Sequence, residues 1–353
     1  GVRLVGSEMC IRDSFLFNLT PDVLEIVAVV GAITALVAAA IGLVQTDIKK
    51  VLAYSTVSQL GLMFLALGCG AYEIAVFHVI THAFFKACLF LGSGSVIHAL
   101  HGEQDMRNMG GLRKVMTITF ATFLISTLAI SGLPPFSGFF SKDEILMTAF
   151  HHNPVLWAIG SLASIMTAFY MFRLLYLTFY KEFRGTEEQK HHLHESPALI
   201  TFPLIVLALL ALVGGAISLP GHSWLNHYLT PIMSSPAAHH ELGTTEYALM
   251  GVAVVGALIG IGIAYAKYMS KGEVPPADAE FTGLSKVLYN KLYVDEIYMA
   301  IIVKPIYAIG SFFKNFVEEA ISGLVFGFGK VANLLGNGGR APVSYTHLTL
   351  PTK

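Results

Sequence analysis

Apolar segments of about 20 residues follow one another along most of this chain, separated by short polar turns. A helix needs about 20 apolar residues to cross the hydrocarbon core of a bilayer. Charged residues make up only 13% of the chain, against about a quarter in soluble domains. The sequence therefore predicts an all-α fold, a polytopic membrane helix bundle in contact with the lipid bilayer. The expected spans are Val23–Val44, Val51–Leu67, Ala71–Leu100, Val115–Phe150, Val155–Tyr180, Pro197–Leu219 and Glu246–Tyr268.

Three ionisable residues interrupt the apolar stretch Phe77–Phe90: His78, His82 and Lys86. Their spacing of four residues places all three on one stripe of a helix, rising about 12 Å. A lysine at the centre of an isolated span costs about 3 kcal/mol or more, so we expect the stripe to face the bundle interior. A row of titratable groups in a low dielectric is what a proton path requires.

Two other interpretations of the two histidines remain open. Either His78 or His82 alone is compatible with a hydrogen bond between helices that has only a structural role. Their i, i+4 spacing also occurs in zinc helices, but the sequence H-V-I-T-H lacks the glutamate of the H-E-x-x-H motif. The zinc interpretation is therefore the weaker one.

The segment Val115–Phe150 is too long for one straight membrane helix. Its 36 residues would extend about 54 Å as a helix, against a hydrocarbon core of about 30 Å. Prolines remove backbone donors and disrupt helices, and glycines add flexibility. The sequence therefore predicts a discontinuous transmembrane helix, of the kind that forms ion sites in transporters. The residues expected to break the helix are Gly132, Pro134, Pro135 and Gly138.

Just after this break the chain carries Lys142 and Asp143. Ser141 followed by Glu144 fits a capping box, which predicts that a second half-helix starts there. Lys142 would then lie near the positive end of the helix dipole, where it can exchange protons. The alternative is a polar helix cap near the membrane interface.

The distribution of Lys and Arg predicts the topology, because cytoplasmic loops carry an excess of both. If Val115–Phe150 crosses the membrane once, the loops on one side are basic. The loops on the other side contain no Lys or Arg; they are 68–70, 151–154 and 220–245. We therefore expect the basic loops in the cytoplasm. We expect Arg173, near the cytoplasmic end of its span, to extend its charge to the interface.

The pattern changes after the last of these spans. The transmembrane domain is predicted to cover 15–270 and residues 271–304 to form a linker. Residues 305–335 are predicted to form a long amphipathic lateral helix at the cytoplasmic boundary. A tilted extra span is the alternative. The polar stripe of this helix consists of Ser311, Asn315, Glu318, Ser322, Gly329 and Asn333.

Other function classes lack support. The net charge of −1 argues against nucleic acid, and the three cysteines show no CxxC spacing for a cluster or a zinc site. The ends, 1–14 and 343–353, are polar and patternless, and we interpret them as non-native tails on a fragment of a longer protein.

Four motifs resemble a known family, the distal antiporter-like membrane subunits of respiratory complex I (NADH:quinone oxidoreductase), called chain L in bacteria and chain 5 in mitochondria. The similarity extends in order over about 15–342. The motifs are T-D-I-K-K-V-L-A-Y-S-T-V-S-Q-L-G from Thr46, F-H-V-I-T-H-A-F-F-K-A-C-L-F-L-G-S-G-S-V-I-H from Phe77, D-M-R-N-M-G-G-L from Asp105 and G-F-F-S-K-D-E-I-L from Gly138.

The resemblance implies a proton-translocating subunit of a bacterial inner membrane complex, with no cofactor of its own. Flavin, Fe–S clusters and the quinone site would lie on other subunits. Lys86 with His78 and His82 would form the central part of a proton relay, and Lys142 with Asp143 its end at the broken helix. The segment 305–335 would contact neighbouring antiporter-like subunits. The alternative is the large subunit of a multi-subunit sodium/proton antiporter, which shares the broken-helix core.

Overall fold

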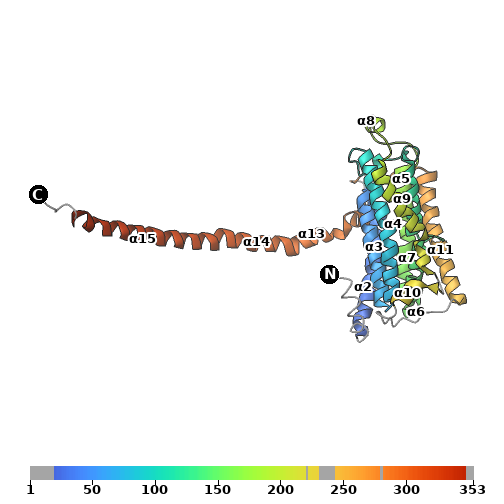
Figure 1. Cartoon of the computed structure of the whole chain (residues 1–353), viewed down its shortest axis with the longest axis horizontal. Helices are drawn as coiled ribbons and strands as arrows, with labels where there is room; N and C mark the ends of the chain where they lie inside the picture. Colours follow the sequence, from blue (N-terminus) through green and yellow to red (C-terminus); the bar gives the residue numbers. More distant parts are fainter. Residues whose placement is uncertain (1–19, 220–221, 230–242, 279–280, 347–353) are drawn as a thin grey trace. The chain divides into compact units, whose positions relative to one another are not determined.

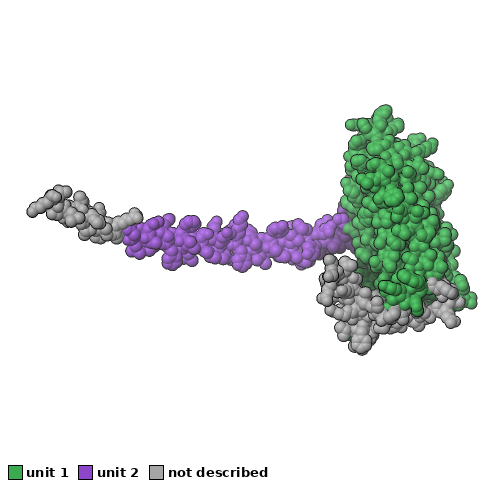
Figure 2. All heavy atoms as spheres, viewed as in Figure 1, with its two compact units in different colours: residues 1–289 green, residues 290–353 purple. Residues whose placement is uncertain are grey.

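The computed structural model describes residues 20–219, 222–229, 243–278 and 281–346. The chain divides into two units, residues 1–289 and residues 290–353 (Figure 2). The predicted tail 1–14 lies outside the described residues, as does most of the second tail.

The first unit is a bundle of long helices that stand side by side (Figure 1). Its long helices are α2 (Pro21–Val44), α3 (Ile48–Gly68), α4 (Tyr72–Ala99), α5 (Thr117–Ile130), α6 (Ser137–His152), α7 (Pro154–Phe179), α9 (Ala198–Val213) and α11 (Thr244–Ala264). The short elements are η1 (Met106–Asn108), η2 (Leu112–Lys114), α8 (Glu187–His191), η3 (Gly214–Ile217), α10 (Trp224–Leu229), the π-helical η4 (Tyr265–Ser270) and α12 (Gly283–Tyr289). Two short strands, β1 (Ser218–Leu219) and β2 (His222–Ser223), pair antiparallel.

Seven helices of the described residues are long and apolar enough to cross a membrane. Six belong to the bundle, and the seventh covers Lys291–Gly338 in the second unit. The chain is a multi-pass membrane protein, and the predicted all-α helix bundle is confirmed.

The discontinuous helix is confirmed as well. α5 ends at Ile130 and α6 begins at Ser137, with Pro134 and Pro135 in the interruption and Gly132 at a φ of +75°. The predicted capping box is wrong, because α6 starts one turn before Ser141 and no side chain caps it.

Small residues bring α2 and α3 into close contact, as they do in many membrane bundles. An added Cβ at Gly61 would lie 2.5 Å from the backbone nitrogen of Ala35, and one at Gly31 would lie 2.5 Å from that of Leu65. Both contacts are to backbone, which has no freedom to rotate away.

We therefore expect Gly61→Val to destabilise the bundle by about 1–3 kcal/mol, the usual cost of overpacking. Gly94→Val is the matched control, because an added Cβ at Gly94 meets nothing within 4 Å. Unfolding of the purified protein in detergent measures both. Equal stability of the two variants would contradict the close contact of α2 and α3.

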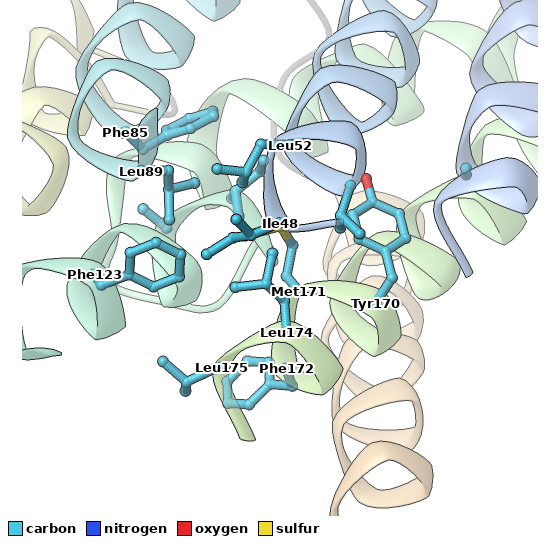
Figure 3. Packing of buried hydrophobic residues seen from close by; sticks show 14 of the residues in the cluster. Ile48, Leu52, Phe85, Leu89, Phe123, Tyr170, Met171, Phe172, Leu174 and Leu175 are labelled. Atoms are coloured by element: carbon cyan, nitrogen blue, oxygen red, sulfur yellow. The ribbon is translucent and has the colours of Figure 1, made fainter. Parts of the chain in front are cut away.

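The core of the bundle lies where α3, α4, α5 and α7 meet. Figure 3 shows Leu52 of α3, Phe85 of α4 and Phe123 of α5 in this core with Met171 of α7. The candidate site described below is built on the same helices and on α6.

Arg173 of α7 lies in the bundle interior, with only 2% of its surface exposed. Its guanidinium donates to the carbonyl of Leu43 near the C-terminus of α2 and lies over the ring of Tyr268. The expectation that Arg173 reaches the interface is wrong. The helix end offers an unpaired carbonyl inside the protein, and this carbonyl takes the charge instead.

An ion-pair group connects the loop after α4 with the segment after α11. Arg107 pairs with Asp105 and, at 2.9 Å, with Asp278. The hydrogen bonds that Arg107 donates to the Asp105 carboxylate raise the pKa of Arg107 above its usual value. The rings of His101 and His192 also meet edge-to-face at this end of the bundle, 5.2 Å between centroids, so two of the basic loops lie together. Which side of the membrane they face stays a prediction.

The second unit is one long helical segment. It comprises η6 (Lys291–Tyr293), α13 (Val294–Tyr298), the π-helical η7 (Met299–Val303), α14 (Lys304–Phe312), the π-helical η8 (Phe313–Glu318) and α15 (Glu319–Thr346).

After the short turn η6, continuous helix begins at Val294, not at Pro305, and so occupies part of the predicted linker. Pro305 has no amide hydrogen to donate, and the π-turn of η7 just before it accommodates this gap. Large apolar side chains such as Phe316 and Phe328 are exposed in this unit. The lateral role of the helix stays a prediction.

Candidate functional site

The structure places the predicted ionisable row of α4 mostly in the interior of the bundle. His78 is fully buried, Lys86 is 4% exposed, and His82 is partly buried. They lie on one stripe of α4, and this stripe contacts α3 and α6 through the hydrogen bonds described below.

Both ring nitrogens of His78 have polar neighbours from other helices. Nδ1 lies 2.9 Å from Oγ of Ser141 on α6, and Nε2 lies 3.2 Å from Oε1 of Gln59 on α3. The hydroxyl of Thr81 lies 2.9 Å from the same Ser141 oxygen. An imidazole with a partner on each nitrogen can accept a proton on one side and release one on the other.

His82 contrasts with His78. Its Nε2 is buried and has no hydrogen-bond partner among the described residues. Its ring lies edge-on to Phe85, at 5.5 Å between centroids, and 6.3 Å from the ring of His78. Buried polar atoms are rarely left unsatisfied, so this nitrogen marks a position where a water molecule can bind.

Lys86 binds a backbone carbonyl of the neighbouring helix. Its Nζ donates to the oxygen of Leu52 on α3 at 3.0 Å and lies 5.9 Å from the ring centroid of Phe90. Among the described residues no carboxylate lies within ion-pair distance of Lys86. A buried amine without a counter-charge is costly to keep protonated, so its proton is easily exchanged.

Lys142 lies in the second turn of α6 and is 4% exposed. Its Nζ donates to the carbonyl of Ile130, the last residue of α5, at 2.9 Å. Gly132 lies beside the lysine stem, since an added Cβ there would be in ordinary van der Waals contact with it, 3.6 Å from Cδ of Lys142. The amine therefore lies at the negative C-terminal end of α5 rather than at the positive end of α6, and the predicted dipole effect is wrong.

Asp143 follows Lys142 and is 6% exposed. It makes no ion pair with Lys142 or with any other cation that the structure describes. The two residues are adjacent in sequence, but their side chains leave the helix about 100° apart.

The structure thus joins His78 of α4 to α6, the half-helix that carries Lys142. Sequence reasoning missed Gln59, Thr81 and the role of Ser141. Gln59 is a polar residue inside a predicted membrane span, so it could have been identified in the same way as His78 and Lys86. No sequence pattern indicates that the backbone carbonyls of Leu52 and Ile130 accept hydrogen bonds from the two lysines. Among the residues searched, no three His, Cys, Asp or Glu side chains form a metal site.

Comparison with known proteins decides the family. The family described as NADH:quinone oxidoreductase/Mrp antiporter, TM, matches residues 3–167, which include α2 to α6 and most of the site. This part of the chain belongs to the family. The predicted resemblance to the antiporter-like subunits is confirmed.

Curated relatives in this family have similar names. NAD(P)H-quinone oxidoreductase chain 5 of Picosynechococcus sp. is 48% identical over 316 residues, which are 81% of this chain and 48% of the relative. NADH-quinone oxidoreductase subunit L of Rhodobacter capsulatus is 48% identical over 247 residues, 67% of this chain and 34% of the relative. The chain spans about half the length of the curated relatives it matches first.

Two solved structures share the fold of this antiporter-family chain. The Mrp complex from Dietzia sp. DQ12-45-1b matches with a TM-score of 0.53 at 23% identity, over 84% of this chain and 33% of the other. The membrane-bound sulfane sulfur reductase, an archaeal respiratory membrane complex, matches with a TM-score of 0.62 at 24% identity, over 88% and 56%.

Proposed function

We propose that this chain is part of a proton-translocating membrane subunit of an NADH:quinone oxidoreductase, equivalent to chain L or chain 5. Protons move along His78, His82 and Lys86 to Lys142 and Asp143 at the broken helix. The observation that carries the proposal is the contact between His78 and Ser141, because it joins the buried row of α4 to the half-helix of Lys142.

The chemistry of the site supports this role. Two buried lysines, Lys86 and Lys142, bind carbonyls rather than carboxylates, so no ion pair with a described residue fixes their charge. A group whose charge is not fixed can gain and lose a proton when a neighbouring charge changes. Redox reactions on other subunits, which hold the flavin, the Fe–S clusters and the quinone, would supply that change.

The names of the relatives favour this function over that of a sodium/proton antiporter subunit. In this proposal the membrane is a bacterial inner membrane with the basic loops in the cytoplasm. The long helical segment of the second unit contacts neighbouring antiporter-like subunits through its exposed apolar side chains. Rescue of a sodium-sensitive strain without NADH oxidation would support the antiporter instead.

Lys142→Ala tests the proposal in the membrane complex that contains this chain. We expect the number of protons pumped per electron to fall, because the amine at the helix break is lost. Proton uptake into inside-out vesicles during NADH oxidation measures it. Lys190→Ala is the control, since Lys190 is exposed and pairs with the exposed Glu187. An unchanged ratio in Lys142→Ala would reject the relay.

A further inference from the structure

Three ionisable residues, Lys142, Asp143 and Glu144, follow one another on α6. Successive residues of a helix point about 100° apart, so the three lie on different faces of α6. Positions four and seven residues further along show what each face contains. For Lys142 and Asp143 both positions are apolar. These apolar residues are Leu146, Ala149, Met147 and Phe150.

The face of Glu144 is different. Four residues on is Thr148, and seven residues on is His151, at the end of the helix. Glu144 and Thr148 are both half-buried. On the faces of Lys142 and Asp143 the residues that follow are apolar. Of these three faces, only that of Glu144 therefore has polar side chains up to the end of α6.

The same face also extends back toward the buried row. Ser141 and Ser137 lie three and seven residues before Glu144, on its side of the helix. The oxygen of Ser141 is the group in contact with Nδ1 of His78. The hydroxyl of Ser137 is buried and has no partner among the described residues, which leaves it free to bind water.

At the other end the face meets two acidic residues. Nε2 of His151 lies 3.4 Å from Glu246 of α11, and Nε2 of His152 lies 2.7 Å from Glu25 of α2. Glu246 is 7% exposed, whereas both histidines are partly open to solvent. Pairs of imidazole and carboxylate at a surface can take up and release protons near neutral pH.

We propose that this polar face of α6, made of Ser141, Glu144, Thr148 and His151, is a proton outlet from His78 to the end of α6. The proposal rests on the proposed function and changes its last step: the proton leaves the α4 row at His78 toward Glu144, whereas Lys142 drives this release through its charge and Asp143 is not needed. The outlet ends at the pair of His151 and Glu246.

The steps balance as simple proton transfers. His78 gives the proton on Nδ1 to Ser141, whose hydroxyl proton passes to a water molecule and then to the Glu144 carboxylate. Glu144 releases it through water at Thr148 to His151, which gives it to bulk water. The rises along the helix are about 4.5 Å from Ser141 to Glu144 and about 6 Å from Glu144 to Thr148, and a bridging water covers such a gap.

Glu144→Gln tests the outlet in the membrane complex that contains this chain. The substitution keeps the shape of the side chain and removes the titratable group. We expect the proton-to-electron ratio to fall to the value found for Lys142→Ala, with normal amounts of assembled complex on a native gel. Glu144→Asp, which keeps a carboxylate, restores most of the lost pumping.

A second pair of variants keeps the test independent of folding. Thr148→Val replaces the hydroxyl, which donates to the backbone carbonyl of Glu144 at 2.9 Å, by a methyl group and is expected to lower the ratio, whereas Thr148→Ser keeps the hydroxyl and is expected to retain it. Normal pumping in both Glu144→Gln and Thr148→Val would overturn the outlet. If Lys142→Ala still lowered pumping in that case, the proposed function would stand and only the outlet would fail.

Discussion

Gly138→Val is expected to prevent the two half-helices from packing, and with it the assembly of the bundle. An added Cβ at Gly138 would lie 2.1 Å from the carbonyl oxygen of Ala129 and 3.5 Å from the ring of Phe85. Ala129 is in the last turn of α5, next to Ile130, whose carbonyl binds Lys142. Any shift that relieves the clash therefore moves the lysine site as well.

We expect Gly138→Val to destabilise the protein by about 3 kcal/mol or more, at the upper end of overpacking costs. The yield of assembled membrane complex and its unfolding in detergent measure the effect. Gly262→Val in α11 is the control, because an added Cβ there meets nothing within 4 Å. A normal yield of the Gly138 variant would contradict the close contact of α5 and α6.

Much of the fold could be predicted because membrane spans depend on simple properties. An apolar run of bilayer length predicts a helix wherever it occurs, and the pair Pro134 and Pro135 identifies the interruption between α5 and α6. The start of α6 could not be predicted from Ser141 and Glu144. The close contact of Gly138 with α5 favours an earlier start, and a local sequence pattern carries no information about that contact.

The site was predictable to the extent that ionisable groups stand out in apolar segments. His78, Lys86 and Lys142 were identified in this way. Their partners were not, because two of them are backbone carbonyls at Leu52 and Ile130, and every residue has a carbonyl. Which carbonyl accepts depends on how the helices pack.

Lys86→Met is expected to abolish the proton transport of this subunit without unfolding it. Methionine has a volume similar to that of lysine and suits an apolar interior. The carbonyl of Leu52 keeps a donor, because the hydroxyl of Thr56 also binds it at 2.9 Å. What is lost is the only amine at this point of the α4 stripe.

Lys86→Arg separates charge from proton exchange. A guanidinium keeps the positive charge and the hydrogen-bond donors but does not release its proton in proteins. We therefore expect this variant to be as inactive in pumping as Lys86→Met. Pumping that persists in Lys86→Arg would mean that the charge alone is needed and that Lys86 carries no proton.

The most direct measurement is the proton-to-electron ratio of Lys86→Met, of Lys142→Ala and of the double variant, in vesicles that oxidise NADH. Residues that act in series lose their function together, so effects within one unit are not additive. We therefore expect the double variant to pump as many protons per electron as either single variant. A wild-type ratio in either single variant, or a further loss in the double variant equal to the sum of the two, would contradict a single relay through both lysines.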